Sequence, residues 1–141
     1  MNDYLSGPLK RGEMAPPSAF EIDADALNDV LQAIGAEEVG ACVASVLADI
    51  EHLIGQLSVG GSHDVLDAVG REAHHLSGGC RSLGLVSIGA VCARIEADAR
   101  KRVDHGWPDY CVELAQQRKA LSDWWSIASA DSRLTGTSPP E

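Results

Sequence analysis

The chain has 141 residues and a formal net charge of -10, from 11 basic and 21 acidic residues. A nucleic-acid binder or a protein that docks on an anionic membrane needs a basic face, so this balance argues against both. The hydrophobic fraction of 45% suffices for one core, and with only 4% aromatic residues that core must consist mainly of small aliphatic side chains. These values favour one domain of packed helices with protein partners.

The two ends of the chain are polar and rich in glycine and proline. We expect flexible tails at residues 1–19 and 131–141, on either side of a helical bundle at 20–130. No signal-peptide core and no run of about 18 apolar residues is visible, so we expect a cytoplasmic protein. The cysteines contain no CxxC pair and fit core positions in a reducing compartment, rather than a disulfide framework; they are Cys42, Cys80, Cys92 and Cys111.

Apolar residues recur at steps of three and four through the central region, which indicates helices. Asp23 can cap the first helix, Gly35 and Gly84 mark boundaries, and Pro108 suits a first helical turn. We expect helices at about 23–35, 36–57, 62–83, 85–104 and 108–130. Short connections favour antiparallel neighbours. The predicted fold is all-α: an antiparallel up-down four-helix bundle with a short additional N-terminal helix.

The third predicted helix has a narrow apolar stripe, which consists of Val69, Ala73, Leu76, Cys80 and Leu83. At about 100° per residue, His74 lies roughly 140° from Val69 and is expected to face solvent. Gly70, Gly78 and Arg81 fall on the same outward face, and Ser77 falls at its edge. Such a stripe is typical of one helix in a bundle.

Two glycines bracket His74, one turn before and one turn after it. Each costs about 1 kcal/mol relative to Ala in a helix interior, which suggests that access to His74 compensates for lost stability. A third, Gly79, lies toward a flank, where close helix packing is the better explanation. Packing could also explain all three glycines. An exposed neutral imidazole is nucleophilic near pH 7 and can accept a phosphoryl group from an acyl phosphate.

At these residues the sequence resembles the histidine-phosphotransfer (HPt) family. The family pattern is H-x-L-K-G, followed five and six positions later by an aliphatic residue and Gly. The segment AHHLSGGCRSLGL supplies His74, Leu76, Gly78, Leu83 and Gly84. The pair Ile95-Glu96 in CARIEADAR resembles the family's next helix, and FEIDADAL is typical of its first. The likeness covers roughly residues 20–126.

The resemblance implies that His74 accepts a phosphoryl group from a receiver-domain aspartate and passes it to another receiver domain. The partners would be receiver domains of a hybrid histidine kinase and of response regulators. Mg²⁺ is expected on the receiver, with no cofactor on this chain, which we expect to be a monomer. The register disfavours His75, because Ser77 and Gly84 then fall at positions that do not fit the pattern.

Ser77 departs from the family pattern, which usually has Lys three positions after the histidine. A hydroxyl cannot neutralise the charge of about -1.5 to -2 that a phosphoryl group adds. Arg81 and Arg71 are nearby candidates to compensate, with Gly70, Ser77, Gly78 and Arg81 forming the expected phosphoryl environment and docking surface. The departure leaves room for an alternative, a phosphotransfer-inactive adaptor that only binds receiver domains.

The sequence disfavours two other functions. A metal site could use His74, His75, Cys80 and His105, but the first two side chains diverge by about 100° on a helix, so we expect no metal site. An autonomous histidine kinase would need a glycine-rich ATP motif, and the sequence contains none. We therefore expect a phosphocarrier without ATP binding or autokinase activity.

Overall fold

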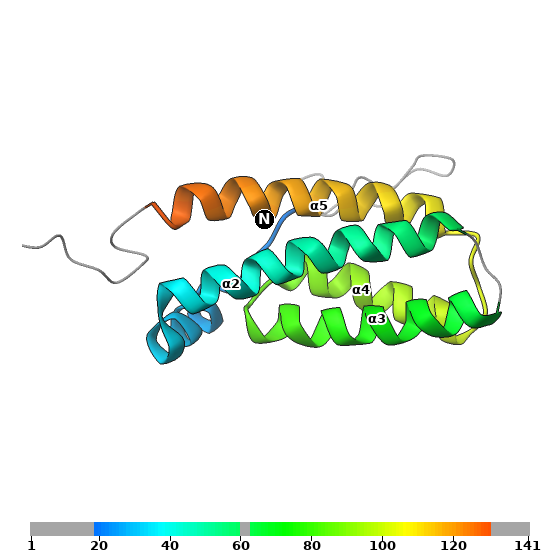
Figure 1. Cartoon of the computed structure of the whole chain (residues 1–141), viewed down its shortest axis with the longest axis horizontal. Coiled ribbons are helices and arrows are strands. Elements are labelled where there is room, and N and C mark those ends of the chain that lie inside the picture. Colours follow the sequence, from blue (N-terminus) through cyan, green and yellow to red (C-terminus); the bar gives the residue numbers. More distant parts are fainter. Residues whose placement is uncertain (1–18, 60–62, 131–141) are drawn as a thin grey trace, which may run out of the picture.

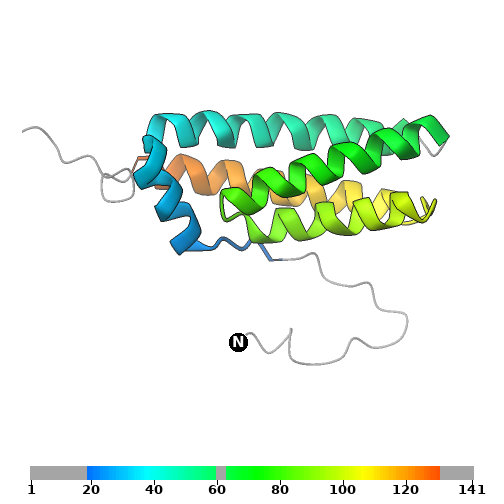
Figure 2. The same ribbon diagram turned by 90° about the horizontal axis from the view of Figure 1, so that it is seen from below.

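The computed structural model describes residues 19–59 and 63–130. Its helices are α2 (Ala24–Val59), α3 (His63–Ser82), α4 (Val86–Arg100) and α5 (Trp107–Ala128). They form an elongated bundle in which α2 and α4 each pack beside both α3 and α5 (Figures 1 and 2). The predicted antiparallel up-down bundle is confirmed. Most of the two predicted tails lies outside the described residues.

The first two predicted helices form one element, α2, with a sharp bend at Gly35. Gly35 has φ 87° and ψ 162°, a conformation that glycine adopts without a steric penalty. The segment before the bend lies across one end of the bundle (Figure 2) and is the predicted short additional helix. Its N-cap is confirmed, because the backbone N–H of Ala26 donates to Asp23 Oδ1 at 3.1 Å.

The core consists mainly of small aliphatic side chains from all four helices. The predicted stripe of α3 is confirmed, since its residues from Val69 to Cys80 are at most 2% exposed and Leu83 is 5% exposed. All four cysteines are free thiols. Cys80 and Cys92 are buried between helices, and burial raises the pKa of the Cys80 thiol to about 12. These two cysteines therefore act as small packing residues.

The turn between α3 and α4 is fixed by Gly84. It has φ 74°, and a Cβ there would lie 2.6 Å from the carbonyl oxygen of Asp23, so only glycine fits. The backbone N–H of Asp23 donates to the Gly84 carbonyl at 2.7 Å, and Ile22 forms an isolated bridge with Leu85. This tight turn holds α3 and α4 side by side, so residues of the two helices can form one surface.

Helix α2 is long and apolar enough to cross a membrane by length and composition alone. Its buried residues belong to the bundle core with those of the other helices, and the bend at Gly35 interrupts it. These are properties of a core helix and do not indicate a membrane protein.

Candidate functional site

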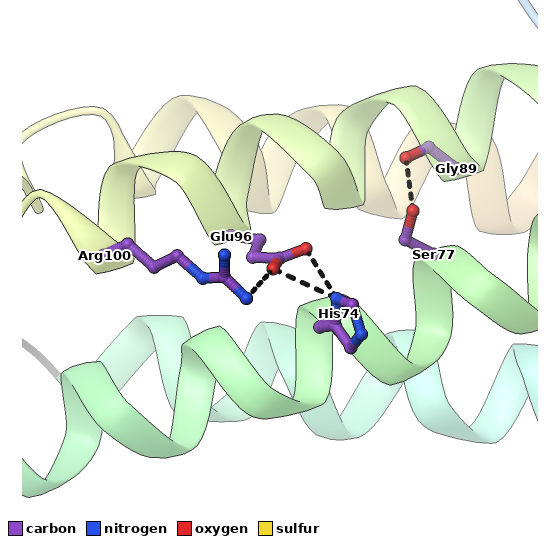
Figure 3. Close-up of polar contacts among 5 residues, drawn as sticks. All are labelled: His74, Ser77, Gly89, Glu96 and Arg100. Atoms are coloured by element: carbon purple, nitrogen blue, oxygen red, sulfur yellow. Dashed lines mark hydrogen bonds and ion pairs between the residues drawn. The ribbon is translucent and has the colours of Figure 1, made fainter.

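His74 lies midway along α3, and its side chain is 70% exposed. The preceding residue, Ala73, is fully buried and fixes the rotation of α3 about its axis. The predicted outward orientation of His74 is therefore confirmed. Its Nδ1 lies 3.2 and 3.1 Å from the two carboxylate oxygens of Glu96 on α4 (Figure 3).

Glu96 connects His74 to a third side chain. Its carboxylate is only 14% exposed and also forms an ion pair with Arg100 Nη2, at 2.5 Å, one turn further along α4 (Figure 3). An ionised carboxylate only accepts hydrogen bonds, so Nδ1 of His74 must carry the ring proton. The lone pair then resides on Nε2, the nitrogen away from Glu96, which leaves Nε2 as the nucleophilic atom.

A pocket of about 340 Å³ opens beside His74 between α3 and α4. Three guanidinium groups line it, from Arg71, Arg100 and Arg102. Arg102 pairs with Asp67 at 2.8 Å, whereas Arg71 has no ion pair with any residue that the structure describes. The histidine therefore stands beside a locally cationic pocket in a chain whose net charge is -10.

The glycines near His74 differ in their surroundings. Gly78 is exposed, and a Cβ added there would meet nothing within 4 Å, so the surface after His74 is open as predicted. Gly70 lines the pocket beside His74 but is less exposed than predicted: it is half-buried, with an added Cβ 3.6 Å from Ala99, because α4 packs against this side of α3. The packing role expected for Gly79 is also wrong, since Gly79 is exposed and an added Cβ would meet nothing within 4 Å.

A family model described as the Hpt domain matches residues 37–124. The match covers more than half of the chain and includes His74, Glu96 and Arg100. The chain belongs to the Hpt domain family. A comparison with curated proteins found no match, and a comparison with solved structures found none either.

Membership of the Hpt family gives the chain a role in histidine phosphotransfer within phosphorelays. Hpt domains are phosphocarriers rather than enzymes, and their partners are receiver domains of two-component systems. The predicted family and the coarse function are therefore confirmed.

Ser77, at the Hpt lysine position, does not border the exposed face as expected. It is 5% exposed, and its hydroxyl donates to the Gly89 carbonyl on α4 at 3.4 Å (Figure 3). The expectation is wrong because α4 approaches α3 closely at Gly89, which has no side chain. Arg81 lies exposed about two turns beyond His74 and does not line the cationic pocket.

His75, the neighbour of the proposed Hpt phosphoacceptor, points toward α2 instead. It lines a separate pocket of about 590 Å³ with Asp49 and Glu72. His75 is exposed, and Glu72 binds Nδ1 of His52 on α2 at 2.7 Å. Among residues 19–59 and 63–130, no group of three or more His, Cys, Asp or Glu side chains could hold a metal ion.

Two features of this Hpt site were not predicted from the sequence. The family resemblance includes Glu96 only as half of the Ile95-Glu96 pair, and none of the sequence motifs includes Arg100. Their spacing of four residues is a signal for an ion pair on one helix face, but such pairs are common on solvated helices. Nothing in the sequence showed that this pair faces His74, because that depends on how α4 is rotated against α3.

Proposed function

We propose that this Hpt protein is a phosphorelay intermediate, which accepts a phosphoryl group on His74 from one receiver-domain aspartate and transfers it to another. The observation that carries the proposal is the exposed imidazole of His74, which donates from Nδ1 to the carboxylate of Glu96 and lines a pocket with three guanidinium groups. This contact orients the ring and leaves the Nε2 lone pair available to attack phosphorus.

In the accepting step, the Nε2 lone pair forms the N–P bond while the P–O bond to the partner's aspartate breaks. The aspartate leaves with the electron pair as a carboxylate. The ring, still protonated on Nδ1, then carries a positive charge, which Glu96 stabilises as the carboxylate of a catalytic triad stabilises an imidazolium. The reverse reaction with a second receiver domain transfers the group onward.

Little more is needed from the carrier, because phosphoryl transfer depends mainly on positioning and on charge neutralisation. We expect Mg²⁺ on the receiver domain to supply part of that neutralisation. The phosphate then comes from a receiver and not from ATP, in agreement with a sequence that contains no glycine-rich ATP motif. We place this exchange in the cytoplasm, with the chain acting as a monomer.

Incubation with ATP alone should give no label, whereas a phosphorylated cognate receiver domain should transfer its label to this chain. The label should be lost in acid and kept in base, as expected for a phosphohistidine. A panel of the organism's receiver domains would identify the cognate ones by their rates. Labelling by ATP alone would contradict the proposal, and receiver binding without any transfer would favour the inactive adaptor.

A further inference from the structure

We propose that the pocket between α3 and α4 is the site that binds the phosphoryl oxygens, with Arg100 and Arg71 as its cationic donors. The inference rests on the proposed role of His74 and extends it. It assigns the positive charge that stabilises phosphohistidine to Arg100 at the end of α4 and to Arg71 one turn before His74 on α3, whereas the family pattern has a lysine three positions after the histidine.

The need for such a donor follows from Ser77. Its side chain is buried and its hydroxyl donates to the Gly89 carbonyl, so Ser77 contributes no positive charge beside His74. A phosphoryl group brings a charge of about -1.5 to -2. In a chain with a net charge of -10, that group requires nearby cations.

Arg100 is well placed to supply one of these cations. Nη2 of Arg100 and Nδ1 of His74 both contact Oε2 of Glu96, so the guanidinium lies close to the imidazole ring (Figure 3). The Arg100 side chain is 70% exposed and can rotate without moving α4. After transfer, Glu96 can remain with the charged ring while Arg100 binds the new phosphoryl oxygens, which suit the planar guanidinium group.

Arg71 is the second donor, one turn before His74 on α3. It lines the same pocket and is exposed, with no carboxylate partner among the residues that the structure describes. Arg102 is already bound to Asp67 and adds to the local positive charge. Gly70 has no side chain to fill the space between these groups. The pocket is thus lined by three guanidinium groups and by one carboxylate, that of Asp67, which is paired with Arg102; Glu96 contacts the pocket residue Arg100.

The test uses phosphoramidate, a small phosphodonor that needs no partner protein and thus separates anion binding from receiver docking. Nε2 displaces ammonia from phosphorus, and intact mass measurement follows the rate of phosphorylation and, after donor removal, the lifetime of the product. Arg100→Gln and Arg71→Gln should each lower the rate about three- to tenfold, and the double variant should lower it further. Arg100→Lys should restore part of the loss.

Arg118→Gln is the control, because Arg118 on α5 pairs with Glu51 and donates to the Leu47 carbonyl on α2, and neither of these helices lines the pocket. The Arg100→Gln effect should also persist when Glu96→Gln is present. Its disappearance in that background would mean that Arg100 only positions Glu96, which would overturn the proposal. So would unchanged rates in the double arginine variant, or an equal loss in Arg118→Gln.

The outcomes also separate this inference from the proposed function. If the wild-type chain is phosphorylated at His74 without any dependence on these arginines, only the inference fails. If His74→Gln is labelled as readily as the wild-type chain, the proposed function fails as well.

Discussion

The described part of the chain contains two histidine–glutamate pairs, His52–Glu72 across α2 and α3 and His74–Glu96 across α3 and α4. The two are alike in several respects. Both glutamates bind Nδ1, and the two histidine side chains are 62% and 70% exposed. The His52 contact is the shorter, at 2.7 Å. A carboxylate on Nδ1 therefore does not by itself distinguish a phosphoacceptor from an ordinary surface pair.

The surroundings of the two pairs differ. Glu96 is the more buried glutamate and also binds Arg100, whereas Glu72 forms no ion pair with an arginine in the described part of the chain. The cationic pocket lies beside His74, and Gly78 leaves the next turn open. The comparison indicates that an acceptor site needs an oriented imidazole together with nearby positive charge and a clear approach for the partner.

The largest expected effect comes from removing the histidines in turn. His74→Gln should abolish label transfer from a phosphorylated receiver domain, because His74 is the one histidine of residues 19–59 and 63–130 that lines the cationic pocket. Its melting temperature should stay nearly unchanged, since the side chain is exposed. His52→Gln and His75→Gln should retain most transfer. Loss of transfer in either of these variants, with His74→Gln still active, would show that the acceptor has been misassigned.

The next effect concerns the two glutamates. Glu96→Gln should slow phosphoryl acceptance about tenfold or more, because the amide holds the ring less firmly and does not stabilise its positive charge. Glu72→Gln, the matched change in the other pair, should leave the rate near that of the wild-type chain. Single-turnover time courses with one receiver domain would check both, and equal rates in the two variants would remove the distinction between the pairs.

A smaller effect is expected at Gly78. Gly78→Ala should raise the free energy of unfolding by up to about 1 kcal/mol, because an added Cβ meets no neighbour and alanine favours the helix. Transfer should nevertheless slow, and slow further in Gly78→Leu, because a side chain there obstructs the receiver. Gly79→Ala is the control. An added Cβ at Gly79 also meets nothing within 4 Å, but Gly79 lines a pocket with residues of α2 and not of α4. Melting curves beside transfer time courses would show whether stability and transfer change in opposite directions.

The smallest effect on transfer is expected from restoring the family's lysine. Ser77→Lys should lower the free energy of unfolding by about 1–3 kcal/mol, since the longer side chain must fit where α4 lies close to Ser77. Phosphohistidine lifetime should not increase, because the cationic donors already line the pocket. A longer lifetime with unchanged stability would indicate that position 77 still reaches the phosphoryl group.

Much of this fold could be predicted from the sequence, because helical periodicity directly encodes which side of a helix is buried. The stripe of α3 and the outward position of His74 followed from residue spacing alone. The errors at Gly70 and Ser77 arose because a single helix does not show where its neighbour packs. Both residues lie on flanks that α4 covers. Arg100 could not be placed for the same reason, since its approach to His74 depends on the pairing of two helices.

The central claim is that His74 takes the phosphoryl group on Nε2 while Glu96 holds Nδ1. Long-range ¹H–¹⁵N NMR correlation of the histidine rings, before and after phosphorylation by a receiver domain, tests it most directly. We predict that only the His74 ring changes strongly, with phosphorus bonded to Nε2 and the proton kept on Nδ1. Phosphorylation of Nδ1, or of His52 or His75 in place of His74, would contradict the account.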